Sequence, residues 1–119
     1  MPTHVKAPTV IQSAGNKPKL IREYVGRVNS KTSGASVAHM KSPSGWVEPG
    51  QTPEFDEYTV VLRGCLRVEH DGGVMDVRAG EAVHVQAGER VRYGSPFEGG
   101  AEYVAVCLPA FTLEAAKRE

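Results

Sequence analysis

The segment that begins at Gly45 combines chemically capable side chains with a regular spacing. Intervals of five, one, three and six residues separate Gly45, Gln51, Pro53, Glu57 and Gly64. Glu57 offers a carboxylate, which can bind a metal ion or transfer a proton, and Gln51 offers only a neutral amide oxygen. A stable metal site usually needs three or more protein ligands, and Pro53 offers none. The segment therefore favours acid–base or binding chemistry over a metal centre.

This spacing resembles the first sequence motif of the cupin family. The usual cupin is a small β-barrel that holds a metal ion on three histidines and one glutamate. Gln51 and Pro53 stand where the family has two of these histidines, and Glu57 stands where it has the glutamate. The resemblance implies a barrel whose two-histidine metal motif is degenerate, so we expect no metal and no other cofactor.

A second segment is similar to the other cupin motif. Its two glycines are matched by Gly80 and Gly88, while the proline, the metal-binding histidine and the asparagine are replaced by Gln86, Val91 and Ser95. Residues 48–58 and 102–111 look most like a subgroup of small cupins related to ethanolamine-utilisation cupins. That subgroup includes members without the two-histidine signature, and a cupin barrel alone does not specify a reaction.

The rest of the pattern agrees with an all-β chain. From residue 35 onward, short apolar segments alternate with glycine-containing turns, which is typical of a barrel or sandwich. The expected strands cover residues 35–40, 57–64, 65–70, 74–79, 82–87, 90–95 and 101–108. Residues 19–28 fit either a short helix or a strand. In the tail, Thr112 is placed to cap a short helix.

We therefore expect one domain, an all-β cupin double-stranded β-helix (jelly-roll) barrel with a short C-terminal helix, over residues 17–119. Residues 1–16 contain few large apolar side chains and are expected to form an N-terminal arm. Cupins of this size commonly pair, and such an arm could exchange between subunits. Pairing would also cover exposed strand edges, so we expect a homodimer.

The cupin resemblance implies that positions 51, 53, 57, 91 and 93 point into the barrel, and two-residue alternation adds Thr59 and Val61. The expected pocket wall is Gln51, Glu57, Thr59, Val61, Val91 and Tyr93. Loss of water around Glu57 would raise its pKa toward the range of a general acid or base. Tyr93 could orient a substrate oxygen or donate a proton, and Gln51 could bind a carbonyl. Alternatively, hydrogen bonds from Tyr93 or Gln51 merely satisfy Glu57.

Two further groups are candidate ligand-binding residues. The acidic loop at 46–57 is stiffened by prolines, so Trp46 and Glu48 could bind an amine or other cation. Alternatively, Trp46 plugs the barrel end beside a solvated acidic turn. His39 and His84 lie within expected strands, and each faces either the lumen or the other side of its sheet. In the lumen, either histidine could bind a ligand or rebuild a metal site with Glu57.

Composition limits the possible partners. The chain of 119 residues has 14 basic and 14 acidic residues, and it shows no basic stripe that would favour nucleic acid. No apolar run approaches the ~20 residues that span a bilayer, and the N-terminus lacks the apolar core of a signal peptide. We therefore expect a cytoplasmic protein with neither nucleic acid nor membrane as partner. In that compartment, Cys65 and Cys107 are interpreted as small buried apolar side chains.

Three functional hypotheses follow. In the first, the chain binds a small polar metabolite and is a metal-independent or metal-poor isomerase, cyclase or lyase. Glu57 transfers the proton, helped by Tyr93 and Gln51. In the second, the barrel is a non-catalytic metabolite-binding or assembly module. In the third and weakest, a metalloenzyme uses a rebuilt site of Glu57 with His39 or His84. The sequence names no substrate and does not establish that a reaction occurs.

Overall fold

The computed structural model describes Met1–Glu119, and its regular elements are antiparallel strands and one short helix. The elements are β1 (Thr9–Ile11), β2 (Leu20–Val25), β3 (Ser36–Ser42), β4 (Trp46–Val47), β5 (Asp56–His70), β6 (Gly73–Arg78), β7 (Ala82–Val85), β8 (Val91–Ser95), β9 (Ala101–Leu108) and α1 (Leu113–Ala116). The prediction of an all-β chain with a short C-terminal helix is confirmed. The segment that fitted either a helix or a strand forms β2.

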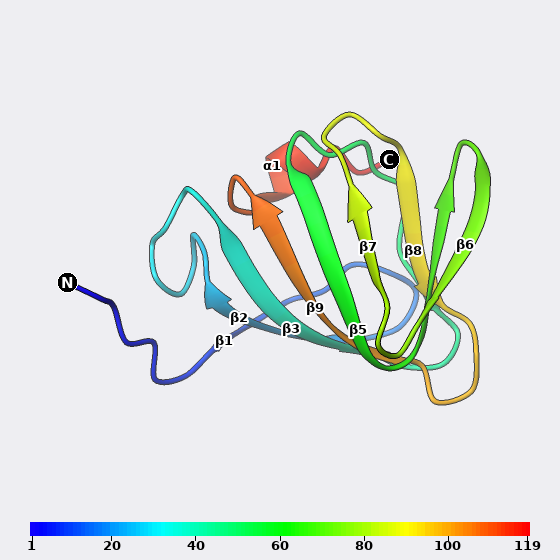
Figure 1. Cartoon of the computed structure of the whole chain (residues 1–119), viewed down its shortest axis with the longest axis horizontal. Coiled ribbons are helices and arrows are strands. Elements are labelled where there is room, and N and C mark those ends of the chain that lie inside the picture. The colour runs from blue at the N-terminus through cyan, green and yellow to red at the C-terminus, as the bar shows by residue number, and fades with distance from the viewer.

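Strand β5 connects the two sides of the barrel (Figure 1). Its first half pairs with β7 and β9, and its second half pairs with β6 and β8. The change of partners occurs at Gly64, whose φ of 76° belongs to the left-handed region. A side chain there would collide with the carbonyl oxygen of Gly100. The two strands expected at 57–64 and 65–70 are therefore one strand that bends at a glycine.

The strands of the sheet follow the order β1-β2-β3-β9-β5-β8-β4, with β6 and β7 each paired to β5, and this curled sheet encloses the core. Strand alternation sends one side chain in two inward, as in β9, where Ala101, Tyr103, Ala105 and Cys107 are all buried. Trp46, Val61, Leu66 and Val91 belong to the main apolar cluster. This cluster fills part of the barrel and leaves the rest as a cavity.

The C-terminal segment closes one end of the barrel. The Thr112 hydroxyl accepts a hydrogen bond from the Ala115 amide at 2.9 Å, so the expected helix cap is confirmed. Phe55 is fully buried, and its ring centroid lies 5.6 Å from that of Phe111. The Glu54 amide also donates to the Ala115 carbonyl at 2.8 Å. These contacts attach the tail to the loop that precedes β5.

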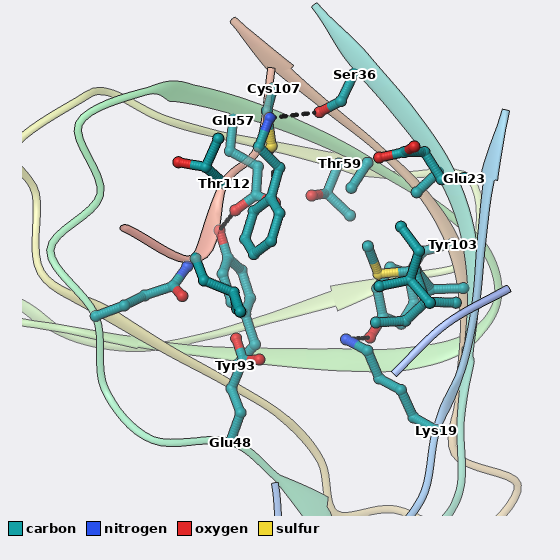
Figure 2. Close-up of a pocket in the computed structure, with 18 of the residues that line it drawn as sticks. Lys19, Glu23, Ser36, Glu48, Glu57, Thr59, Tyr93, Tyr103, Cys107 and Thr112 are labelled. Carbon is teal, nitrogen blue, oxygen red and sulfur yellow. Dashed lines mark hydrogen bonds between the residues drawn. The ribbon is translucent and has the colours of Figure 1, made fainter. Parts of the chain in front are cut away.

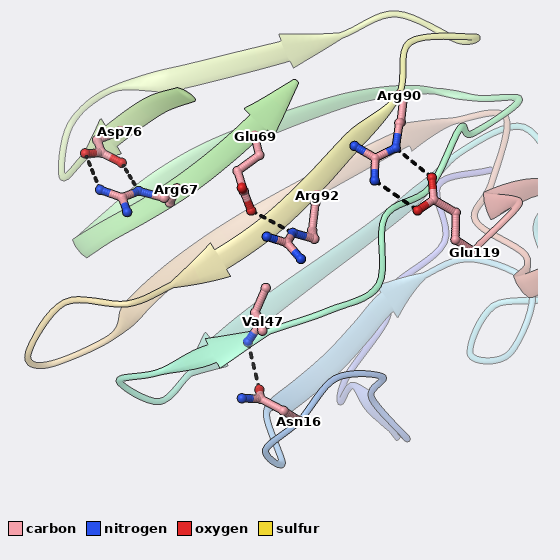
Figure 3. Close-up of polar contacts among 8 residues, drawn as sticks. All are labelled: Asn16, Val47, Arg67, Glu69, Asp76, Arg90, Arg92 and Glu119. Atoms are coloured by element: carbon pink, nitrogen blue, oxygen red, sulfur yellow. Dashed lines mark hydrogen bonds and ion pairs between the residues drawn. The ribbon is translucent and has the colours of Figure 1, made fainter. Parts of the chain in front are cut away.

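Much of the segment expected to be an arm lies against its own chain. Strand β1 pairs with β2, and the Trp46 indole Nε1 donates to the Ala14 carbonyl at 3.0 Å. The Asn16 side chain accepts a hydrogen bond from the Val47 amide at 2.9 Å (Figure 3). Residues 9–16 therefore help to build the barrel wall. Exchange of residues 1–16 with a second subunit stays a prediction.

The outer surface carries ion pairs and an apolar row. Arg67 pairs with Asp76, Arg92 with Glu69 and Arg90 with Glu119, so these arginines point away from the lumen (Figure 3). On the outside of β5, Tyr58, Val60 and Leu62 are exposed. None of the helices is long and apolar enough to cross a membrane.

Candidate functional site

A cavity of about 420 Å³ lies inside the barrel, which is a size typical of small-molecule sites. Its wall comes from the N-terminal segment, from β2, β3, β5, β8 and β9, and from the C-terminal tail. Figure 2 shows its polar side chains converging on a central space. The polar and charged groups that matter for chemistry are Lys19, Glu23, Glu48, Gln51, Glu57, Thr59, Tyr93, Tyr103, Cys107 and Arg118.

Glu57 is held inside this cavity by two donors. Its position on β5 turns its side chain inward, and only 8% of its surface is exposed. The Tyr93 hydroxyl donates to Oε1 at 2.8 Å, and the Cys107 thiol donates to Oε2 at 3.6 Å. Burial raises the pKa of Glu57, and the hydrogen bonds together with the charges of Lys19 and Arg118 offset part of that rise.

The two donors remain protonated at neutral pH. Burial raises the pKa of Tyr93 well above 10, and the neighbouring Glu57 charge adds to the rise. Burial likewise raises the pKa of the Cys107 thiol, with Glu57 as the next cause. Of these three groups, Glu57 is therefore the one suited to exchange a proton near neutral pH.

A second carboxyl lies in the same wall. Glu48 is buried, and its Oε2 atom lies 3.6 Å from Nη2 of Arg118. Burial raises the pKa of Glu48, while the charges of Lys19 and Arg118 lower it. The Arg118 Nε and the Gln51 Oε1 are buried without a hydrogen-bond partner. Both residues line the cavity, so a ligand with a complementary donor or acceptor could satisfy these atoms.

The structure brings together five of the eight predicted site residues. Glu57, Tyr93, Gln51, Glu48 and Thr59 all line the cavity. Gln51 is positioned by backbone hydrogen bonds that it exchanges with Val91 at 2.8 and 2.9 Å.

Three residues that were predicted either to bind ligand or to line the pocket need correction. Trp46, proposed as a ligand-binding residue, is 1% exposed and packs in the apolar core, which agrees with the alternative that it plugs the barrel. Val61 and Val91 also pack in that core and do not line the cavity. Their side chains point inward, but neighbouring apolar groups cover them.

Neither predicted ligand-binding histidine reaches the lumen, which is a further correction. On β3, Ala38 and Met40 face the cavity, so His39 between them faces outward and its Nε2 contacts Glu102 Oε2 at 2.7 Å. His84 is exposed on β7, and its ring stacks on that of Tyr58 with centroids 4.2 Å apart.

The residues present do not fit the metal site of a typical cupin. Pro53 and Val91 have no donor atom, and both oxygens of Glu57 accept hydrogen bonds from side chains. No group of three His, Cys, Asp or Glu side chains is arranged to hold a metal ion. With His39 and His84 outside the lumen, the rebuilt metal site has no histidine ligands.

Comparison with solved structures identifies the fold. An ethanolamine utilization protein Q from Salmonella typhimurium has a TM-score of 0.68 at 19% identity, over 87% of this chain and 97% of that one. A predicted oxalate decarboxylase from Thermotoga maritima has a TM-score of 0.73 at 17% identity, over 92% and 99%. A variant of oxalate decarboxylase from Bacillus subtilis has a TM-score of 0.75 at 18% identity, over 99% and 33%. The chain has the cupin fold. The prediction from the two motifs, a cupin resembling the ethanolamine-utilisation type, is confirmed; at these identities the structural likeness itself is one of fold alone.

Two curated proteins match this cupin in sequence. An acetate kinase EutQ from Salmonella typhimurium is 35% identical over 54 residues, which are 45% of this chain and 24% of that protein. A Myxococcus xanthus protein named endoribonuclease YbeY is 45% identical over 101 residues, which are 85% of this chain and 34% of that protein. The cupin thus spans about a third or less of each relative. No protein-family model matches it.

Sequence reasoning missed five polar groups of this cupin's cavity, which are Lys19, Glu23, Tyr103, Cys107 and Arg118. Lys19 was hidden in a segment with no clear periodicity, and Arg118 lies in the tail, whose position depends on tertiary contacts. Cys107 was interpreted as an apolar side chain, yet it lies directly across from Glu57 in the β5–β9 register. The two-residue alternation of 101–108 was the signal that could have placed it in the lumen.

Proposed function

We propose that this cupin binds a small polar metabolite in its lumen and catalyses a metal-independent proton transfer on it, as an isomerase, cyclase or lyase. One observation carries the proposal: Glu57 lines a cavity of about 420 Å³ with its pKa raised by burial. A carboxyl group that titrates closer to neutral pH is a more effective general acid or base.

The neighbouring residues support this role for Glu57. Tyr93 and Cys107 fix the carboxyl in one orientation, which lowers the cost of bringing it to the substrate. Gln51 contributes a carbonyl oxygen that has no partner in the protein, so a substrate hydroxyl or amine can donate to it. Thr59 adds a hydroxyl to the same wall. Glu57 is the catalytic residue, Tyr93 is a positioning residue, and Gln51 binds substrate.

Solvent exchange tests the proposal directly. Purified protein is incubated in D₂O with a pool of small metabolites, and deuterium gain at carbon is followed by mass spectrometry. We expect at least one metabolite to exchange with wild type, and Glu57→Gln to slow that exchange by roughly 10²- to 10⁴-fold. Glu69→Gln, which changes a glutamate on the outer surface, is the matched control. Unchanged exchange in Glu57→Gln would show that Glu57 is not the acid or base.

A binding or assembly module is the second candidate, and two observations favour it. Tyr58, Val60 and Leu62 form an exposed apolar row, which is a common feature of interaction surfaces. The matched Myxococcus xanthus protein is about three times as long as the matched segment. The nuclease activity in that protein's name is said of the whole Myxococcus xanthus protein. Ligand binding without deuterium exchange of any metabolite would favour the module.

We also propose that the cupin is a cytoplasmic homodimer. Cys65 and Cys107 are buried and free, which suits a reducing compartment. Residues 1–4 are exposed and are available for contact with a second subunit. Light scattering on the purified protein gives the oligomeric state, and a monomeric mass would refute the dimer.

A further inference from the structure

Lys19 places a positive charge in the cavity wall, and no carboxylate lies close enough to form an ion pair with it. Its ammonium donates to the Tyr103 hydroxyl at 3.0 Å and lies 4.0 Å from the centroid of the Trp46 ring. None of the chain's ion pairs includes Lys19. An ammonium group has three donors, so two remain for a ligand after the bond to Tyr103. Figure 2 shows Lys19 beside Tyr103 in the cavity wall.

The carboxylates of the cavity are all engaged by other groups. Glu23 accepts hydrogen bonds from the backbone amides of Val28 and Asn29 at 3.0 and 2.8 Å. Glu48 lies next to Arg118, and Glu57 accepts from Tyr93 and Cys107. Arg27 also lines the cavity outside any ion pair, but its side chain is exposed to solvent, whereas Lys19 is half-buried. The partly buried cation of the wall that has no ion-pair partner is therefore the ammonium of Lys19. A partly dehydrated cation is best complemented by an anion.

We propose that the cavity binds a small organic monocarboxylate, with the carboxylate group on Lys19 and the reacting part of the molecule toward Glu57. Trp46 and Tyr103 hold the ammonium in position, which assigns to Trp46 a supporting role in place of direct ligand contact. A single half-buried ammonium without an ion-pair partner matches one negative charge. A dianionic phosphate would leave a second charge unpaired near Glu48 and Glu57. The inference names the substrate class of the proposed function; the binding itself does not depend on catalysis.

Lys19 also connects binding to the acid–base group. Its positive charge lowers the pKa of both Glu48 and Glu57, which means that its field reaches both carboxyls. A bound carboxylate would neutralise that field, so the pKa of Glu57 should rise when the ligand binds. Glu57 would then be a stronger base with substrate present than in the empty site.

The single tryptophan of the chain provides a reporter for this interaction. The Trp46 indole N–H signal is followed by ¹H–¹⁵N NMR during titration with sodium propionate. Its neutral analogue propionamide, the cation n-propylammonium and inorganic phosphate serve as comparison ligands at equal ionic strength. We expect a saturable shift with propionate and at least tenfold weaker binding of the other three.

Variants separate this inference from the proposed function. Lys19→Met should weaken propionate binding at least tenfold, and Lys19→Arg should keep much of it because the charge remains. Lys17→Met is the matched control, since Lys17 is exposed and bonds to the Ser44 carbonyl at 3.0 Å. Glu57→Gln should still bind propionate while losing deuterium exchange. Thermal unfolding of each variant checks that it is folded.

Three results would overturn the inference. They are the absence of saturable propionate binding to wild type, equal binding of propionamide, and unchanged binding in folded Lys19→Met. Tighter binding of inorganic phosphate than of propionate would also overturn it and would indicate a phosphate ester as the ligand. If propionate binds as expected but no metabolite exchanges deuterium, the inference stands and the proposed catalysis fails.

Discussion

Tyr93→Phe is the substitution that best tests the description of the Glu57 site. It removes the hydroxyl that donates to Glu57 Oε1 at 2.8 Å and leaves the ring in place. Both side chains are buried, so water does not readily replace the lost donor. The ionised form of Glu57 then loses one of its two hydrogen bonds, while the protonated form loses less.

The size of the effect follows from this geometry. A hydrogen bond to a charged group contributes about 1.5 to 3 kcal/mol, and one pKa unit corresponds to about 1.4 kcal/mol. Tyr93→Phe should therefore raise the pKa of Glu57 by roughly one to two further pH units. A buried carboxyl with a raised pKa contributes stability that is complete below its ordinary pKa of 4.5 and is lost as pH rises through the folded-state value. The variant should thus be less stable than wild type by ~2 kcal/mol at pH 8 and by ~1 kcal/mol or less at pH 4.

Two measurements check this prediction. The ¹³C NMR titration of Glu57, assigned by comparison with Glu57→Gln, gives the pKa directly. Thermal unfolding at pH 4 and pH 8 gives the stability difference, which should appear at pH 8 as a melting temperature lower by roughly 5 to 10 °C. Tyr58→Phe is the control, because Tyr58 is exposed on the outside of β5. An unchanged Glu57 titration in Tyr93→Phe would refute the hydrogen bond and the reasoning built on it.

Three further predictions address the pH dependence, the barrel end and the cysteines. Glu57→Gln should reduce the loss of stability as pH rises above 5 and be at least as stable as wild type at pH 8, because the carboxyl at position 57 no longer ionises and only Glu48 remains as a buried carboxyl with a raised pKa in the cavity. A loss of stability specific to pH 8 in thermal unfolding would contradict this. Phe55→Ala should lower the free energy of unfolding in urea by about 3 to 5 kcal/mol, because Phe55 is 0% exposed. Phe97 is 39% exposed, so Phe97→Ala should lower it much less. Similar losses in the two variants would rule out the described barrel end. Burial raises the thiol pKa of both Cys65 and Cys107, so neither should react with iodoacetamide in native protein at pH 8 while both react in urea, as measured by intact mass.

The sequence predicted the barrel well because its glycines and its alternation are local signals. Gly64 was identified from motif spacing alone, and the structure shows its physical reason, a left-handed bend packed against Gly100. Alternation along β5 correctly directed Glu57 and Thr59 inward. Such rules need only the neighbouring residues in the chain, so one sequence is enough to apply them.

Alternation alone could not predict which residues line the cavity. Alternation also turned Val61 and Val91 inward, but whether an inward residue meets the cavity or the core depends on side chains from other strands. To predict whether His39 and His84 face the lumen or the outer surface, the strand register must be known, and a single histidine in a strand does not reveal it. Arg118 is placed in the cavity wall by contacts with residues far away in sequence, including an isolated antiparallel β-bridge with Gln51.

The cavity wall draws on both ends of the described chain. Ile11 and Lys19 contribute from one side, Phe111 and Arg118 from the other, with most of the barrel between them in sequence. The many long-range pairings of β5 do not depend on either segment. Local opening of one terminal segment could therefore expose the ligand site while the barrel stays folded, at a lower free energy than global unfolding. A bound ligand would then slow amide hydrogen exchange chiefly in these two segments, so exchange rates there would report occupancy of the lumen.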